Sequence, residues 1–272
     1  MAVVGFVGAG QMGAPMVRRL LAAGTPVRMY ARRPEIRAEF TAAGATVVDS
    51  PREAAEGSDV VLACLFSDPQ LLEVCEGPDG VLAGLAPGAV LASHTTGSTR
   101  TVELLAGAAE RSGAHVVDAP VSGTATDIAE GNLTVLVGGP RPLVDRIQQA
   151  VAPYAATVLG TGPLGSALSI KLVNNLLFAA NCQLAESAAA LGEGLGVDRR
   201  QLFAAIATCS GRSYAASTVG LFPAGEQFVA AAGSFLAKDV QVCQDELAAA
   251  GHDAGLLAAV VHGGPLPLGS RA

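Results

Sequence analysis

The sequence predicts an α/β fold in which a doubly wound parallel sheet is followed by an all-α domain. Three observations support this. Short apolar runs alternate with helical segments in the first half, a glycine-rich turn directly follows the first run, and strand signals end near residue 160. At 272 residues, the chain has room for two domains of moderate size. We therefore expect one domain over residues 1–160 and a second over 161–272.

Seven short apolar runs in the first half are expected to be strands. They span residues 3–7, 27–30, 46–48, 60–65, 90–93, 115–118 and 133–137. Segments rich in Ala and Leu, such as 13–23 and 100–112, separate them and have the composition of helices. Several runs are apolar without alternation, which is typical of strands buried on both faces.

The second half contains helical segments only. A breaker cluster at 161–165 precedes a long helix expected over 166–191, which links the two domains. Further helices are expected at 199–208 and 234–250, and the tail from Gly263 onward is expected to be unstructured. This small helical domain is rich in apolar side chains that need cover, so we predict a homodimer or homotetramer, with a monomer as the alternative.

Composition excludes several classes of function. Half of the residues are hydrophobic and the net charge is -7, which favours a packed core and argues against a nucleic-acid surface. The five cysteines form no C-x-x-C pair, and no metal-ligand spacing occurs with the four histidines, so we expect free thiols, no metal and a cytoplasmic protein. No basic leader precedes the first strand, and no apolar run approaches the ~18 residues of a membrane span.

The glycine-rich turn after strand 3–7 opens the first helix. Its residues are Gly8, Ala9, Gly10, Gln11, Met12 and Gly13, which fit the pattern G-x-G-x-x-G. Between a strand and a helix, this pattern predicts a Rossmann domain that holds the pyrophosphate of a dinucleotide at the helix N-terminus. The alternative is a glycine-rich turn in an α/β protein that binds nothing.

The end of the second strand indicates which dinucleotide binds. An acidic residue that would hold the ribose 2′-hydroxyl of NAD is absent, and Arg32 and Arg33 stand there instead. Guanidinium groups suit the 2′-phosphate of NADP. We therefore predict NADP as the cofactor, with NAD as the alternative; Arg33 could also be a solvated surface charge.

Two further segments suggest chemistry on a small carboxylate. Residues 118–124 follow a strand and offer the Ser122 hydroxyl and backbone N–H groups at a loop, which suits a carboxylate. Lys171 and Asn175 lie four residues apart on the long helix and share one face. Lys171 is the single charged residue between positions 164 and 183, unlike a typical solvated surface lysine.

Several motifs, in order along nearly the whole chain, resemble those of the β-hydroxyacid dehydrogenase family, which includes 3-hydroxyisobutyrate dehydrogenase and tartronate semialdehyde reductase. The matching segments are 6–16, 118–123, Gly131, Gly138, Gly139, Gly162 with Gly165, Lys171 with Asn174 and Asn175, and Lys238 with Asp239.

The resemblance implies roles for residues on the helix and in the loop. Lys171 would be the general acid that protonates the carbonyl oxygen during reduction, and the base in reverse. Asn175 would orient the substrate, with Asn174 beside it. Ser122 and Gly123 would bind the carboxylate, and the next residue, Thr124, is included in this substrate-binding set.

The resemblance also implies cofactor contacts beyond the glycine turn. Thr95 and Thr96 fall where the family has a Ser-Thr pair near the cofactor, and Lys238 would lie near the nicotinamide. Leu65, the last residue of the expected strand 60–65, is added to this set. The His94 and His115 side chains and the cysteines are expected to be structural.

The chain departs from the family at three places. Thr124 stands where the substrate loop has a second glycine, which adds bulk beside the acid-binding loop. Ala167 replaces a glycine, and His94 replaces the commoner acidic residue before the threonine pair. Two other functions therefore stay open, an imine reductase on the same scaffold and a non-catalytic NADP-binding protein. Lys171 counts against the first, since imine reductases commonly carry Asp or Tyr there.

Overall fold

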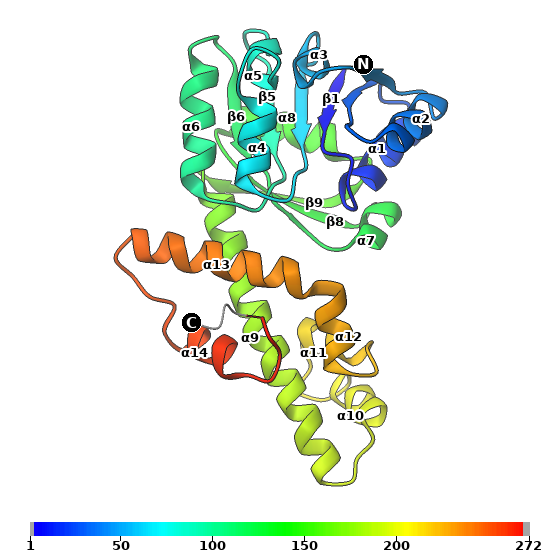
Figure 1. Ribbon diagram of the computed structural model, residues 1–272, viewed down its shortest axis with the longest axis vertical. Coiled ribbons are helices and arrows are strands. Elements are labelled where there is room, and N and C mark those ends of the chain that lie inside the picture. The colour runs from blue at the N-terminus through cyan, green and yellow to red at the C-terminus, as the bar shows by residue number, and fades with distance from the viewer. Residues whose placement is uncertain (1–2, 269–272) are drawn as a thin grey trace. The chain divides into compact units, whose positions relative to one another are not determined.

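The computed structural model describes residues 3–268 of the chain (Figure 1). Its described part contains one sheet of nine strands in the order β3-β2-β1-β4-β5-β6-β8-β7, with β9 paired to β8. Strands β1 to β6 are parallel, and β8 is antiparallel to β6. The strands are β1 (Val4–Val7), β2 (Val27–Tyr30), β3 (Thr46–Val48), β4 (Val60–Ala63), β5 (Val90–Ser93), β6 (His115–Asp118), β7 (Val121–Ser122), β8 (Leu133–Gly138) and β9 (Ala155–Gly162).

Two apolar layers cover the two faces of this sheet. Alternate residues of strands β1 to β6 enter opposite layers, as Phe6 and Val7 of β1 do, and both are fully buried. One layer contains side chains of α1 (Gly13–Ala22), α2 (Pro34–Ala42), α7 (Ala125–Glu130) and α8 (Arg141–Val151). The other contains side chains of α3 (Pro51–Ala55), α4 (Asp68–Cys75), α5 (Val81–Gly84) and α6 (Thr99–Glu110). The predicted doubly wound α/β fold is confirmed.

All seven expected strands are present, but β7 and β9 were not predicted. β9 escaped prediction because its sequence, AATVLGTG, is small and glycine-containing, and most of its residues are exposed or half-buried. It pairs with β8 along most of its length, so tertiary pairing rather than local propensity makes it a strand.

The chain divides into two compact units, residues 1–171 and 172–272. The division falls inside α9 (Ser166–Gly194), later than the predicted boundary at residue 160. The second unit is helical, as predicted, and its hydrophobic core includes Leu176, Phe203 and Phe228. Its other helices are α10 (Arg199–Ile206), α11 (Tyr214–Gly220), α12 (Gly225–Phe228), the π-helix η1 (Val229–Gly233), α13 (Ser234–Ala249) and α14 (Gly255–Gly263).

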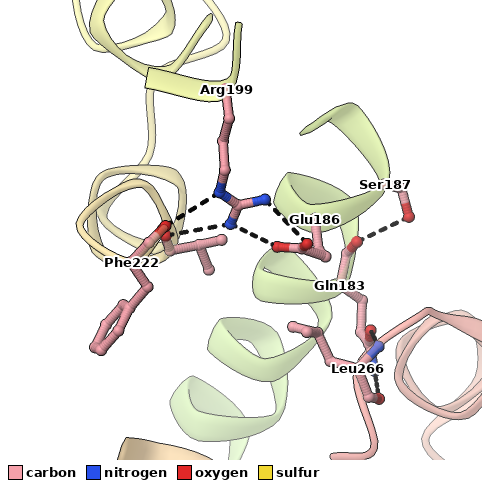
Figure 2. Close-up of polar contacts among 7 residues, drawn as sticks. Gln183, Glu186, Ser187, Arg199, Phe222 and Leu266 are labelled. Atoms are coloured by element: carbon pink, nitrogen blue, oxygen red, sulfur yellow. Dashed lines mark hydrogen bonds and ion pairs between the residues drawn. The ribbon is translucent and has the colours of Figure 1, made fainter. Parts of the chain in front are cut away.

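The expectation of an unstructured tail from Gly263 onward is wrong for the described part of the chain. The side-chain amide of Gln183 holds this segment from α9 (Figure 2). Its Nε2 donates to the carbonyls of Leu266 at 2.6 Å and Val261 at 2.8 Å, and its Oε1 accepts from Leu266 N at 2.8 Å. Leu266 and Leu268 are buried in the helical core. Residues 269–272 lie outside the described residues.

Candidate functional site

The glycine turn between β1 and α1 has the geometry that a dinucleotide requires. Gly8 has a φ of +95°, and a Cβ there would lie 2.2 Å from the Cys64 carbonyl oxygen. A Cβ on Gly13 would lie 2.1 Å from the Gly8 oxygen, so this glycine permits close packing of α1 against the turn. Around Gly10, by contrast, nothing lies within 4 Å of a Cβ, which leaves open space for a phosphate.

The N-terminus of α1 has no capping side chain. Its N-cap is Met12, whose side chain makes no capping hydrogen bond, and its first turn has no acidic residue. Ala14 N already donates to the Gly10 oxygen and Pro15 has no N–H, so the helix dipole is what favours an anion at this end. These residues fit the pyrophosphate of a nicotinamide dinucleotide, together with Ala9 and Gln11 of the same turn.

The loops after β4 and β5 carry three more residues of the predicted cofactor set, Leu65, Thr95 and Thr96. The Thr95 hydroxyl oxygen accepts a hydrogen bond from Leu65 N at 3.2 Å, which ties the two loops together. Thr95 is buried, whereas Leu65 and Thr96 are half-buried. These loops follow the carboxyl ends of adjacent parallel strands, the edge at which ligands of such sheets bind.

A buried histidine beneath these loops joins two strand ends. His94 Nδ1 lies 2.5 Å from the Ala119 oxygen, and Nε2 lies 2.8 Å from the Tyr154 hydroxyl. Burial lowers the pKa of His94 to about 4, although the Ala119 bond acts in the opposite direction. The neutral ring then donates from Nδ1 and accepts from Tyr154, which is a structural arrangement.

Arg32 and Arg33 both extend from the end of β2 toward solvent. Arg32 Nη1 lies 3.8 Å from Glu73 Oε1, and both side chains are more than half exposed. Arg33 Nη1 lies 3.7 Å from Glu35 Oε1 in a similarly exposed pair. Arg32 and Glu73 also line a surface pocket with Tyr30. The Arg32 guanidinium is thus accessible to an anion, and Glu73 competes for it.

The loop after β6 places the predicted carboxylate-binding residues at and after β7. Ser122 is half-buried at the end of β7, whereas Gly123 and Thr124 are exposed. Gly123 has a φ of +135°, and a Cβ there would lie 2.9 Å from a Leu133 methyl group. Thr124 forms a reciprocal capping box with Asp127 at the start of α7. The hydroxyl that departs from the family pattern is therefore used to cap a helix.

On α9, Lys171 and Asn175 are one helical turn apart, and both are buried, at 9% and 7% exposure. A lysine is rarely buried to this extent unless its charge is paired. Asn175 Nδ2 donates to Asp239 Oδ2 at 2.5 Å, and Asn175 Oδ1 accepts from the exposed Asn174 at 3.1 Å. The Asn175 amide is thereby fixed in orientation.

Asp239 belongs to this group as well, although at the level of sequence it appears only in the Lys238-Asp239 motif and has no assigned role. Its carboxylate is buried, and its Oδ1 lies 2.8 Å from Lys238 Nζ. Lys238 is thus only one-fifth exposed and pairs with a buried acid that in turn holds Asn175. One signal for this contact was present in the sequence: Asp239 directly follows Lys238 on a helix with few other charges.

The cysteines agree with a structural role, with one exception. Burial raises the pKa of the Cys64, Cys75 and Cys182 thiols to about 12, so these groups stay protonated at neutral pH. Cys243 is buried as well. Cys209 is exposed, so it does not fill the core as expected.

Two family models cover most of the chain. Residues 3–174 match the NAD-binding domain of 6-phosphogluconate dehydrogenase. Residues 165–262 match the NAD-binding domain of NADP-dependent 3-hydroxyisobutyrate dehydrogenase. The chain belongs to the β-hydroxyacid dehydrogenase family. The resemblance inferred from the motifs is confirmed.

Individual relatives agree with this assignment. The mitochondrial 3-hydroxyisobutyrate dehydrogenase of Rattus norvegicus is 32% identical over 250 residues, which is 89% of this chain and 75% of the relative. The structure of the Mycobacterium tuberculosis 3-hydroxyisobutyrate dehydrogenase with L-serine is 28% identical, with a TM-score of 0.83 over 96% of this chain and 91% of that one. The structure of Psf3 with NADP+ and 2-OPP is 26% identical, with a TM-score of 0.79 over 90% and 87% of the two chains.

The chain is therefore an oxidoreductase, an NAD(P)-dependent dehydrogenase of 3-hydroxy acids. Similarity to an imine reductase from Pseudomonas sp., at 20% identity, reflects a shared fold only. Among the described residues, no helix is long and apolar enough to cross a membrane.

Proposed function

We propose that the enzyme interconverts a short 3-hydroxy acid with its oxo acid or semialdehyde, with Lys171 as the general acid and base. The burial of Lys171 on a continuous helix is the observation that carries this proposal. When bound, the nicotinamide cofactor supplies or accepts the hydride. Negative charge then develops on the carbonyl oxygen, and a fixed ammonium group that donates a proton stabilises it.

Asn175 is proposed to orient the substrate oxygen. An amide group has two N–H donors. Asp239 accepts one of them, which fixes the amide plane and leaves the second N–H for the substrate. Lys238 stabilises the Asp239 charge and, in this proposal, contributes near the nicotinamide. Asn174 has a lesser role, because its amide already donates to Asn175.

The substrate is proposed to carry a carboxylate that Ser122 and Gly123 bind. Ser122 offers a hydroxyl at the start of the loop, and the exposed Gly123 offers a backbone N–H. The relative from Mycobacterium tuberculosis was solved with L-serine, which is itself a small hydroxy acid. Because Thr124 caps α7, its methyl group affects substrate shape more than its hydroxyl does.

NADP is proposed as the preferred cofactor, through Arg32. The exposed guanidinium and the missing acid at the end of β2 support this preference, as does a relative solved with NADP+. Arg33, the N-cap residue of α2, pairs with Glu35 in the first turn of that helix, so its contribution is smaller. We keep a cytoplasmic location as a proposal, although several relatives are named as mitochondrial.

A homodimer or homotetramer is proposed on revised grounds. Part of the apolar surface that we expected to need a partner is covered within the helical unit itself, where Phe203, Val219 and Phe228 are buried. Leu221 and Phe235 of the same unit are exposed, at 81% and 41%. Further uncovered apolar surface lies on α9, where four exposed side chains recur at spacings of four and seven residues. They are Val173, Leu177, Leu184 and Leu191, at 53%, 47%, 56% and 72% exposure. A seven-residue repeat suits a second helix packed alongside, and a monomeric mass in light scattering would refute the proposal.

The testing experiment is a screen of hydroxy acids of three to five carbons, and of their oxo forms, with both cofactors. We expect turnover of at least one such pair, faster with NADPH than with NADH. Lys171→Ala is expected to lower turnover by about 10² to 10⁴ and to leave NADPH binding nearly intact. Reduction of cyclic imines instead would favour an imine reductase, and cofactor binding without any turnover would favour a non-catalytic protein.

A further inference from the structure

Asp118 is a fully buried carboxylate at the end of β6, and it contacts the start of the helix that carries Lys171. Its Oδ1 accepts a hydrogen bond from Gly165 N at 2.8 Å, and its Oδ2 accepts one from Leu168 N at 2.9 Å. None of the ion pairs in the described part of the chain involves Asp118, so backbone N–H groups hold its charge.

These two bonds replace a cap that α9 lacks. The residue before its first turn is Gly165, which has no side chain and a φ of +87°. A helix usually satisfies the N–H of its third residue with the side chain of its N-cap residue. Here the third residue is Leu168, and Asp118 supplies the acceptor from a strand far away in sequence. The negative charge at this end also complements the helix dipole.

The surrounding chain is shaped to admit this carboxylate. A Cβ on Gly138, the last residue of β8, would lie 2.2 Å from Asp118 Oδ1. The backbone of Gly138 does not have a positive φ, so space for Asp118, rather than backbone strain, requires glycine there. Thr161 Oγ1 lies 2.7 Å from Ser166 Oγ, a second link between the sheet and the start of α9.

We propose that Asp118 is a positioning residue that fixes the place of Lys171 relative to the substrate loop. Lys171 is three residues beyond Leu168, about 4.5 Å along the helix axis, so a shift of the first turn moves it directly. Asp118 is also the first residue of the 118–124 loop that ends with the proposed carboxylate-binding residues. One buried side chain therefore links the group that binds the substrate to the group that protonates it. This inference rests on the proposed role of Lys171.

Asp118→Asn is the first test. The carboxylate accepts from both Gly165 N and Leu168 N, whereas an amide can accept from only one of them and turns its NH2 group toward the other. We expect turnover to fall about 10-fold or more, because small misplacements of catalytic groups are costly. The dissociation constant for NADPH, measured by fluorescence of the reduced nicotinamide, is expected to stay within about twofold. Asp145→Asn, an exposed carboxylate that pairs with Arg141 on α8, is the matched control and should retain full turnover.

A double-mutant cycle separates positioning from general stability. If Asp118 acts through Lys171, Asp118→Asn has little further effect on the residual turnover of Lys171→Ala. A merely structural role would lower turnover by the same factor in both backgrounds, and that result would overturn the proposal. If Lys171→Ala alone keeps normal turnover, the proposed function fails first, which distinguishes the two failures.

Gly138→Ala provides a second variant if Asp118→Asn does not fold. It keeps the carboxylate but displaces it, so turnover is expected to fall while NADPH binding persists. Unchanged turnover in a folded Gly138→Ala protein, with Asp118 shown by crystallography to have left Gly165 and Leu168, would overturn the proposal. A fall in turnover with both bonds intact would overturn it as well.

Discussion

The buried His94 side chain makes the Rossmann unit sensitive to acid. Burial lowers the pKa of His94 in the folded protein to about 4 from an ordinary value of 6.5. Above pH 6.5 the ring is neutral in both the folded and the unfolded chain, so it contributes no pH dependence. Below pH 6.5 the unfolded chain takes up a proton that the folded protein excludes until about pH 4, so the free energy of unfolding falls across that window.

The size of this loss follows from the pKa difference. Each unit corresponds to 1.36 kcal/mol, so the shift to about 4 corresponds to about 3 kcal/mol lost between pH 6.5 and pH 4. The group is fully buried, so solvent does not screen the effect. The figure is a large fraction of the 5–15 kcal/mol by which such domains are usually stable.

Urea unfolding at a series of pH values measures this loss, followed by tyrosine fluorescence. Two of the three tyrosines, Tyr30 and Tyr154, lie in the first unit. His94→Asn keeps a donor for the Ala119 oxygen but cannot titrate. The wild-type protein is expected to lose about 3 kcal/mol more than this variant between pH 6.5 and pH 4. His115→Asn, at an exposed position, controls for loss of a histidine. Parallel stability curves for wild type and His94→Asn would refute the reasoning.

Three further predictions concern other contacts. Arg32→Gln should raise the NADPH dissociation constant about 10-fold or more and leave that of NADH nearly unchanged. Glu73→Gln should lower the NADPH dissociation constant by up to about fivefold. Fluorescence titration measures both effects, and equal binding of the two cofactors by the wild type would refute this prediction. Glu186→Gln breaks the pair in which Arg199 lies 2.8 Å from Glu186 (Figure 2), and should cost about 3 kcal/mol in denaturant unfolding, because the cation stays buried and unpaired. Gln183→Ala should cost about 2 kcal/mol and make residues 263–268 sensitive to limited proteolysis, since it leaves buried backbone groups unpaired; an unchanged digestion pattern would contradict this.

The sequence was sufficient for the sheet because strands buried on both faces are apolar without interruption, as 60–63 and 90–93 are. It was insufficient for β9, whose small and largely exposed residues form a strand only through pairing with β8. The C-terminal tail was wrongly expected to be unstructured for a related reason. Glycine and proline between residues 263 and 268 suggest disorder, but an amide on a distant helix, Gln183, satisfies the backbone.

In the candidate site too, features set by the local sequence could be predicted, and contacts with distant residues could not. The geometry of the glycine turn and the burial of Lys171 agree with the sequence, because both depend on local spacing and on an uncharged neighbourhood; the catalytic role of Lys171 stays a prediction. The hydrogen bonds of Asp118 and Asp239 could not be predicted, because each is made with a residue at least 47 positions away in sequence. Thr124 looked like added bulk beside the substrate, and only the reciprocal contact with Asp127 shows that it caps a helix.

The central claim is that Lys171 provides the proton in a hydride-transfer reaction on a short 3-hydroxy acid or its oxo form. Single-turnover oxidation of bound NADPH by a short semialdehyde, compared between wild type and Lys171→Ala, tests it most directly because cofactor binding is then already complete. The account predicts that the wild type oxidises the cofactor and that the variant binds it equally well but reacts about 10² to 10⁴ times more slowly. Equal rates of oxidation in the two proteins would contradict it.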